Sequence, residues 1–306
     1  MSIEGLKYYL EDKRRVFEFF NSRGFFKNMS DEQFLRKKFK SMMGYPLDLD
    51  NPKTFCEKIQ WLKLYDRNPL YHQLVDKYAV KKYAAEKLGE EHVLPVLGVW
   101  EHFDDIDFDS LPNQFVLKCT HDSGGLAICT DKASFNREAA KAKIEKCLAF
   151  DYFQKSREWA YKDVPRKIIA EPYLDSLGKP DSIEYKLICM GGKVVTITVC
   201  VGIAHVSLNE RTNDTYDRDY KHRTGYAFYK NAPMEPGLPP QIDEIVSYAE
   251  KLSEGIPQVR CDFYVHEGKV YFGEMTFYTW SGFMDFEPRE CDELLGSYLV
   301  LPEKRT

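Results

Sequence analysis

The chain has 306 residues, of which 43% are hydrophobic, so it can bury a large core and is long enough for two or three lobes. Its net charge of −5, with interspersed charges, argues against general affinity for nucleic acid. The eight cysteines form no C-x-x-C pair and no apolar stretch has the length of a membrane span. We therefore expect reduced thiols, no membrane span and a cytoplasmic protein.

Helical patterns dominate the first third of the chain. Residues 5–45 are predicted to be helical, and we interpret them as an extension that packs on the body of the protein. A further helix is expected after Thr54. Residues 76–88 predict another helix, with Asp76 as its N-cap. Residues 92–100 form a buried, strand-like run.

From residue 115 onward, predicted β-hairpins alternate with predicted helices. The expected strands are residues 115–118, 126–130, 167–174, 183–189 and 193–201. The expected helices are residues 139–150 and 242–252. Residues 207–240 are polar and are predicted to form a long loop or lid. This order indicates an α+β fold rather than a doubly wound sheet.

A lysine and a glycine-containing loop follow the strand at residues 115–118. Lys118 lies near the strand end, and residues 119–125 supply small residues whose backbone N–H groups can approach phosphate oxygens. Taken alone, this segment is more often an ordinary hairpin turn. The apolar strand around Glu171 could likewise present backbone groups to an adenine edge, but alone it indicates an edge strand that ends at Pro172.

The hairpin predicted at residues 259–277 carries the most informative pattern. Residues 259–265 alternate between apolar and polar side chains, as a strand does. A turn follows at residues 266–268, and residues 270–277 resume as a second strand. Two carboxylates occupy strand positions that a soluble sheet usually gives to other residue types.

The length of the turn decides whether the charged residues of this hairpin meet. A three-residue loop places Arg260 opposite Glu274 and Asp262 opposite Phe272, so that these charges and Thr276 share one face. A two-residue loop would divide them between the two faces. Two adjacent carboxylates need a proton or a cation between them, and such ligands suit Mg²⁺ together with substrate phosphates. The alternative is a solvated face with ordinary salt bridges to Arg260.

Taken together, these segments resemble the ATP-grasp superfamily of carboxylate–amine ligases. More narrowly, they resemble its TupA-like branch of polysaccharide biosynthesis, which is sometimes labelled a glycosyltransferase. The resemblance spans roughly residues 50–290. The stretches that carry it are residues 51–71, 76–100, 111–125, 183–194 and 259–283.

The resemblance implies an ATP-grasp fold of the α+β class, in which two α+β lobes grip ATP between them. Residues 1–50 would form an N-terminal helical extension and residues 51–110 an N-terminal lobe. Residues 111–175 would form the ATP-grasp lobe with the phosphate loop and the adenine hinge. Residues 176–306 would form the C-terminal ATP-grasp lobe with the metal site and the substrate lid.

The resemblance also implies an ATP site, position by position. Lys77 and Lys118 match the lysines that contact the ATP phosphates and adenine. The mobile loop that closes over the phosphates corresponds to His121, Ser123, Gly124 and Gly125. The hinge that binds adenine through its backbone corresponds to Glu171, Pro172, Tyr173 and Leu174. Glu184 and Lys186 complete the expected ATP contacts.

The metal and catalytic positions implied by the resemblance fall in the hairpin. Asp262 and Glu274 match the magnesium ligands, and Thr276 stands where many members have an asparagine ligand. Arg260 matches the cation beside the transferred phosphate, and together with Lys118 it is the expected catalytic pair.

Two further positions depart from the pattern of the superfamily. Pro172 stands where a second acid is common, so Asp175 or Glu184 is the expected ribose contact. Cys119 follows the lysine where a more polar or proline-like residue is expected.

The implied reaction has two steps. A substrate carboxylate attacks the γ-phosphate of ATP to give an acyl-phosphate and ADP, and an amine then displaces phosphate to form an amide. The branch points to the carboxylate of a uronic acid, free, nucleotide-activated or in a polymer, and to a small amine, in capsular or surface polysaccharide biosynthesis. The expected substrate contacts are His205, Arg211 and Arg223, in a cation-rich segment.

Two other classes of protein stay open. A glycosyltransferase would also use a metal and a nucleotide diphosphate, but it would leave Lys77 and Lys118 without a clear task. A non-catalytic protein that binds nucleotide or glycan would have no evident need for Asp262 and Glu274.

Overall fold

The structure, a computed structural model, describes residues 12–122, 124–176, 178–202, 210–224 and 230–305. Helices combine with two antiparallel sheets, which confirms the predicted α+β class. The described helices are α2 Lys13–Ser22, α3 Asp31–Met43, α4 Phe55–Tyr65, α5 Leu70–Val75, α6 Ala79–Leu88, α7 Arg137–Leu148, α8 Tyr152–Ser156, α9 Ile242–Leu252 and α10 Glu290–Tyr298. Short 3-10 helices are η1 Glu90–His92, η2 Phe103–Asp105, η3 Trp159–Tyr161 and η4 Thr279–Gly282.

One sheet has four strands and the other has six. The four-stranded sheet, in spatial order, contains β1 Gly98–Trp100, β4 Ile168–Pro172, β2 Phe115–Cys119 and β3 Leu126–Cys129. The six-stranded sheet, in spatial order, contains β10 Lys269–Thr276, β9 Gln258–His266, β5 Ile183–Met190, β6 Lys193–Val201, β7 Asn213–Asp217 and β8 His222–Arg223. Neighbouring strands are antiparallel throughout both described sheets.

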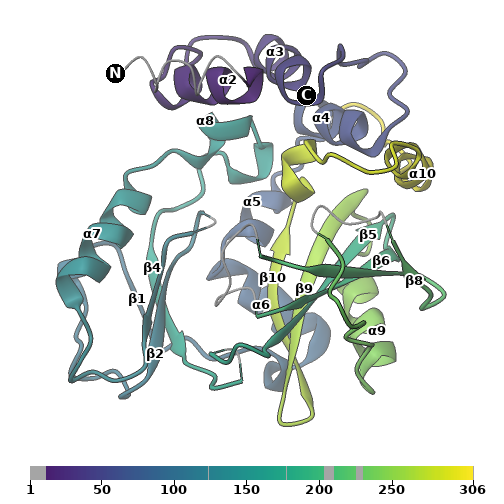
Figure 1. Ribbon diagram of the computed structural model, residues 1–306. Helices are drawn as coiled ribbons and strands as arrows, with labels where there is room; N and C mark the ends of the chain where they lie inside the picture. Colours follow the sequence, from purple (N-terminus) through teal and green to yellow (C-terminus); the bar gives the residue numbers. More distant parts are fainter. Residues whose placement is uncertain (1–11, 123, 177, 203–209, 225–229, 306) are drawn as a thin grey trace.

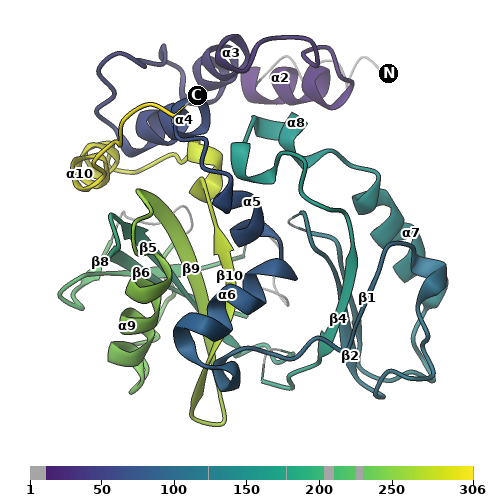
Figure 2. The same cartoon turned by 180° about the vertical axis from the view of Figure 1, so that it is seen from behind.

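The two sheets face each other, and a layer of helices lies across one end of both (Figure 1). Helix α7 covers the outer side of the four-stranded sheet, while α6 and α9 cover the outer side of the six-stranded sheet (Figure 2). The helical layer consists of α2, α3, α4 and α10, so it combines the two ends of the chain. The division of the chain into four parts, with boundaries at residues 50, 110 and 175, stays a prediction.

The predicted helix start at Thr54 is confirmed, whereas the helix predicted at residues 76–88 begins only at Ala79, with Tyr78 and not Asp76 as its N-cap. The Thr54 hydroxyl accepts from the Glu57 N–H at 3.1 Å, and the Glu57 carboxylate accepts from the Thr54 N–H, which is a capping box. The Asp76 carboxylate accepts from the N–H of Tyr78 at 2.8 Å. This bond orders the turn before α6, where the N–H of Lys77 donates to the carbonyl of Thr120 next to the four-stranded sheet.

Two predicted segments differ from the structure. The run 92–100 is a strand only at Gly98–Trp100, because Pro95 has no N–H to donate and the segment before it turns as a 3-10 helix. The segment 207–240, predicted as a loop or lid, contains β7 and β8 in its described part. Its polar residues are strand-forming there because β7 pairs with β6.

The hairpin of β9 and β10 has a two-residue turn, so the predicted pairing is wrong. Glu267 and Gly268 have φ angles of 51° and 78°, as in a type I′ turn, and His266 pairs with Lys269. A bulge at Gly273 then shifts the register by one residue. Asp262 consequently pairs with Glu274, which returns the charged residues to one face.

Three residues of α3 show how the N-terminal helices are attached. Phe34, Leu35 and Phe39 are fully buried in the core that also contains α4 and the covered face of the six-stranded sheet. A separate core lies between the four-stranded sheet and α7. The interpretation of the N-terminal region as a packed extension therefore holds for its described part.

All eight cysteines are free thiols, and seven of them are buried. Among the described residues, no helix is both long enough and apolar enough to cross a membrane.

We predict that Gly296→Ala lowers the free energy of unfolding by about 1–3 kcal/mol. A Cβ at Gly296 would lie 2.2 Å from the backbone oxygen of Lys53, so α10 could no longer pack against the start of α4. Urea unfolding would measure the change. Ser297→Ala, on the exposed side of the same helix, is the matched control, and equal stability of the two variants would contradict the prediction.

Candidate active site

A cavity of about 290 Å³ lies between the two sheets. The four-stranded sheet contributes Lys118 from β2 and Glu171 from β4, while β5, β9 and β10 contribute acidic residues. We call it the smaller cavity. Its lining residues are Lys77, Lys118, Asp122, Gly124, Gly125, Leu126, Glu171, Glu184, Asp262, Phe263, Tyr264, Gly273 and Glu274.

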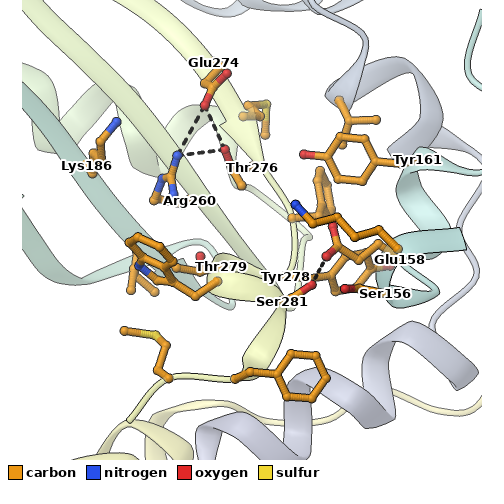
Figure 3. A pocket seen from close by; sticks show the side chains of 18 of the residues that line it. Ser156, Glu158, Tyr161, Lys186, Arg260, Glu274, Thr276, Tyr278, Thr279 and Ser281 are labelled. Atoms are coloured by element: carbon orange, nitrogen blue, oxygen red, sulfur yellow. Dashed lines mark hydrogen bonds and ion pairs between the residues drawn. The ribbon is translucent and has the colours of Figure 1, made fainter. Parts of the chain in front are cut away.

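A larger cavity, of about 570 Å³, adjoins the smaller one, since Lys77, Asp122 and Glu274 line both. Its walls come from the inner face of the six-stranded sheet, the segment of α8 and η3, the turn at residues 278–282 and the N-terminal helices. Figure 3 shows part of this pocket, with Arg260, Glu274 and Thr276 on one side and Glu158 and Ser281 on the other.

Glu171 forms a buried ion pair with two lysines. Its Oε2 lies 2.5 Å from the Nζ of Lys118, and its Oε1 lies 2.5 Å from the Nζ of Lys81 on α6. Burial alone would raise the pKa of Glu171, but the two lysines lower it to about 2. The carboxylate is therefore charged at neutral pH, and it holds Lys118 at the wall of the smaller cavity.

Arg260 joins the charged residues of the hairpin into one network. Its guanidinium donates to the two oxygens of Asp262 at 2.6 and 2.7 Å, to Glu274 at 3.3 Å and to the Thr276 hydroxyl at 3.0 Å. Burial opposes the charge on Asp262, yet Arg260 keeps the pKa of this carboxyl below its usual value. The predicted shared face of Arg260, Asp262, Glu274 and Thr276 is thus confirmed.

Lys186 provides a second cation for the same network. It pairs with Asp262 across β5 and β9, and its Nζ lies 2.7 Å from both Asp262 and Glu184. Burial opposes the charge of Lys186, but these two carboxylates raise its pKa above the usual value. On the inner face of the sheet, the negative charges of Asp262 and Glu184 are therefore paired with the positive charges of Lys186 and Arg260.

The loop between β2 and β3 is held against Lys77. The backbone N–H of Lys77 donates to Thr120 at 3.0 Å, and its ammonium group donates to the carbonyl of Asp122. A Cβ at Gly125 would lie 2.6 Å from the sulfur of Cys119, so this position requires glycine. Lys77, Gly124 and Gly125 all line the smaller cavity.

Several predicted ATP contacts lie elsewhere. His121 is buried, and its Nε2 lies 3.2 Å from the carbonyl of Cys147 on α7, so it lines neither cavity. Pro172, Tyr173 and Leu174 follow the cavity-lining part of β4 and do not line the smaller cavity either. Ser123 lies outside the described residues.

The predicted substrate residues are separated from one another. Arg211 lines the larger cavity. Arg223 is on β8 near the far edge of the sheet, where it pairs with Asp217 at 2.6 Å, and it lines neither cavity. His205 lies outside the described residues.

Sequence analysis missed several residues at the two cavities. Lys81, the second partner of Glu171, lies one helical turn after Lys77, and this i, i+4 spacing was the available signal. Leu126 and Tyr264 offer apolar surface in the smaller cavity. Glu158 carried no local pattern in the sequence, since its position in the larger cavity depends on the tertiary fold.

Two facing lobes with a charged cavity between them form an ATP-grasp fold, as expected. The family model described as "TupA-like ATPgrasp" matches residues 57–300, which is most of the chain. The chain belongs to the TupA-like ATP-grasp family, and hence to the ATP-grasp superfamily of carboxylate–amine ligases, which use ATP. A search of curated proteins gave no match.

Solved structures with a similar fold include several ligases. The D-alanine–D-alanine ligase from Helicobacter pylori is 15% identical, with a TM-score of 0.41, over 76% of this chain and 60% of that chain. D-cycloserine synthetase DcsG is 16% identical, with a TM-score of 0.39, over 76% of this chain and 72% of that chain. The D-alanine–D-alanine ligase from Bacillus anthracis is 16% identical, with a TM-score of 0.37, over 67% of this chain. The match spans 57% of that ligase, less than two thirds of its length.

Of the two predicted magnesium ligands, Glu274 is the one that offers an oxygen without a partner among the described residues. The side chain of Glu274 is 38% exposed, and within the described part of the chain its Oε2 has no hydrogen-bond partner. Asp262 offers hard oxygen atoms, although Arg260 and Lys186 already hold both of them. No group of three or more His, Cys, Asp or Glu residues is arranged for a metal among the described residues, so nucleotide phosphates would have to complete the ligand set.

We predict that Lys118→Met weakens binding of a non-hydrolysable ATP analogue about tenfold to a hundredfold, the value of one charged hydrogen bond. Glu171 keeps its partner Lys81, so the fold should survive. Isothermal titration calorimetry would measure the affinity. Lys141→Met is the matched control, because Lys141 is similarly exposed and pairs with Asp104 outside both cavities. Equal affinities of the two variants would exclude this role.

We also predict that the ion pairs of Glu171 make the protein sensitive to acid. The folded pKa of about 2 lies below the ordinary value of 4.5, so the stabilisation is present above pH 4.5 and is lost as the pH falls toward 2. Its full size would be about 3 kcal/mol. Urea unfolding of wild type and Glu171→Gln at decreasing pH should show a shrinking difference in stability, whereas a constant difference would refute the prediction.

Proposed function

We propose that this protein is an ATP-dependent ligase that joins a sugar carboxylate of the uronic acid type to a small amine through an acyl-phosphate. One observation carries the proposal. The smaller cavity, with its lysines and glycine loop, opens onto the larger cavity at Glu274, beside the guanidinium of Arg260. A phosphate held in the first cavity would therefore meet a carboxylate held in the second.

The smaller cavity is the proposed nucleotide site. Lys77 and Lys118 would neutralise phosphate charge, and the N–H groups of Gly124 and Gly125 would donate to phosphate oxygens. Leu126 and Tyr264 provide apolar surface for the adenine ring. Of the predicted hinge, Glu171 contributes by positioning Lys118.

Asp262 and Glu274, with Thr276 beside them, would hold the magnesium ion. The ion would screen the charge of the transferred phosphate. Arg260 would bind the oxygens that change charge during transfer, because it already lies between the two carboxylates and is fixed by both of them.

The larger cavity is the proposed site of the sugar carboxylate. Its lining contains six basic side chains and four acidic ones, which favours an anionic substrate. Aromatic side chains such as Tyr161 and Trp280, together with hydroxyl groups on β6, suit the faces and hydroxyls of a sugar. We further propose that the enzyme acts in the cytoplasm on a precursor or polymer of a surface polysaccharide.

The test of this function follows one oxygen atom. When a uronic acid carries ¹⁸O in its carboxylate, attack on the γ-phosphate and displacement by the amine must transfer one labelled oxygen to inorganic phosphate. Mass spectrometry of the phosphate released after turnover of glucuronate or UDP-glucuronate with ATP and an amine would detect it. Label that stays entirely in the sugar product would reject an acyl-phosphate and favour a glycosyltransferase.

The variant Glu274→Gln is the control for this experiment. It removes one ionic ligand and little packing, so it should bind nucleotide but release no labelled phosphate. A protein that only binds nucleotide or glycan would release none even as wild type.

A further inference from the structure

Glu158 is a buried carboxylate in the larger cavity that the proposed activation step does not use. It is 6% exposed and lies just before η3, across the pocket from Arg260 (Figure 3). Its Oε1 accepts a hydrogen bond from the hydroxyl of Ser281. Its Oε2 has no hydrogen bond or ion pair with any described residue, although it is not sealed off in the protein interior. One oxygen of this carboxylate therefore faces the cavity.

Among the described residues, no cation is in direct contact with the carboxylate of Glu158. Within the described chain, no Lys, Arg or His nitrogen lies within 4.0 Å of its carboxylate. Lys38 is the obvious candidate, but its ammonium group is bound to Glu18 at 2.8 Å and to the Ser156 hydroxyl at 3.0 Å. An unpaired carboxylate in a buried position is unfavourable unless a ligand compensates for it.

Lys63 lies near Glu158, but its hydrogen bonds go to other groups. It is fully buried, and its Nζ donates to the side-chain oxygen of Gln60 at 3.0 Å and to the carbonyl of Ser281 at 2.8 Å. Burial lowers the pKa of Lys63, and the nearby charge of Glu158 opposes this shift without a direct contact between the two side chains. Its hydrogen bond instead fixes the backbone of the turn that holds Glu158.

The turn at residues 278–282 has an unusual backbone. Tyr278, Trp280 and Ser281 have φ angles of 56°, 51° and 58°, in the left-handed region that side chains other than glycine rarely occupy. Such conformations persist where the surroundings enforce them, and they cluster at functional sites. Here the turn lines the larger cavity and directs the Ser281 hydroxyl toward Glu158.

Glu158 and the reaction centre belong to one continuous pocket. Tyr152 and Tyr161 also line this pocket, and charged residues on both sides of it affect the pKa of their phenol groups. Burial, followed by the charges of neighbours that include Glu158 and Glu274, raises the pKa of both phenols above the usual value. A ligand at Glu158 would therefore share the pocket with one at Arg260.

We propose that Glu158, oriented by Ser281, binds the ammonium group of the amine substrate at the side of the larger cavity opposite Arg260. Each reactant would then bind beside a side chain of opposite charge, the sugar carboxylate at Arg260 and the amine at Glu158. This assignment rests on the proposed ligase function. It names the acceptor as a primary amine that binds as its ammonium form, and Glu158 as the residue that selects it. Because only the neutral amine can attack, the ammonium group would give one proton to the Glu158 carboxylate, and the second N–H proton would leave with the displaced phosphate.

The test separates activation of the carboxylate from binding of the amine. Hydroxylamine, which is uncharged at neutral pH, traps an acyl-phosphate as a hydroxamate without needing an ammonium site. Wild type and Glu158→Gln are compared for hydroxamate formation from ATP, glucuronate or UDP-glucuronate, and hydroxylamine. Both are then assayed for coupling to glycine, L-alanine, L-serine, L-glutamate, L-lysine and ethanolamine.

In Glu158→Gln, we expect hydroxamate formation within about twofold of wild type and a KM for the coupled amine raised about tenfold to a hundredfold, the effect of losing one charged hydrogen bond. Ser281→Ala should raise the same KM by a smaller factor. Glu244→Gln is the matched control, because Glu244 accepts one hydroxyl hydrogen bond, from Tyr248, and lines neither cavity.

An unchanged amine KM in Glu158→Gln would overturn the assignment, and so would a parallel loss of hydroxamate formation. It would also be overturned if wild type formed hydroxamate but coupled none of these amines. If wild type formed no hydroxamate with any uronate, the proposed ligase function itself would fail. The failure of the two proposals can therefore be told apart.

Discussion

The arrangement of both sheets depends on compensation of buried charge. A carboxylate that leaves water stays ionised only where cations or donors replace the lost hydration. Asp262 meets this condition through Arg260 and Lys186, so the charges hold three strands of the six-stranded sheet in one register. Glu171 meets it through Lys118 of its own sheet and Lys81 of α6, a helix packed on the other sheet. That second pair ties the two lobes together at the smaller cavity.

The hairpin shows what could be predicted from the sequence and where prediction failed. Alternation along residues 259–265 placed Arg260 and Asp262 on one face, and this required no tertiary information. The turn was predicted one residue too long. The predicted set of residues still shares one face. The shorter turn alone would have put Glu274 on the opposite face from Asp262, but the bulge at Gly273 shifts the register by one residue and brings them together. A glycine inside a strand was the available signal for a bulge.

Other parts of the site could not be predicted because they depend on contacts between distant segments. Strand β7 has almost no apolar residue, so its sequence resembles a loop, and only pairing with β6 makes it a strand. Glu158 and Ser281 are 123 positions apart in the chain. The lining of the larger cavity includes Glu18, Lys38 and Met42. These residues belong to helices α2 and α3, which precede the part of the chain matched by the family model.

The same rule of charge compensation distinguishes structural carboxylates from those available to ligands. Glu171 and Asp262 each contact two resident cations and fix their positions before any ligand arrives, so Asp262 would join the proposed magnesium site only by sharing its oxygens with Arg260 and Lys186. Among the described residues, Glu274 contacts one cation, Arg260, and its side chain is 38% exposed and lines both cavities, so it can accept a further cation. In the described part of the chain, Glu158 has no cation within 4.0 Å of its carboxylate. The number of resident cations therefore separates Glu171, whose two oxygens are both paired, from Glu274 and Glu158, each of which keeps one oxygen for the proposed magnesium ion and the proposed amine.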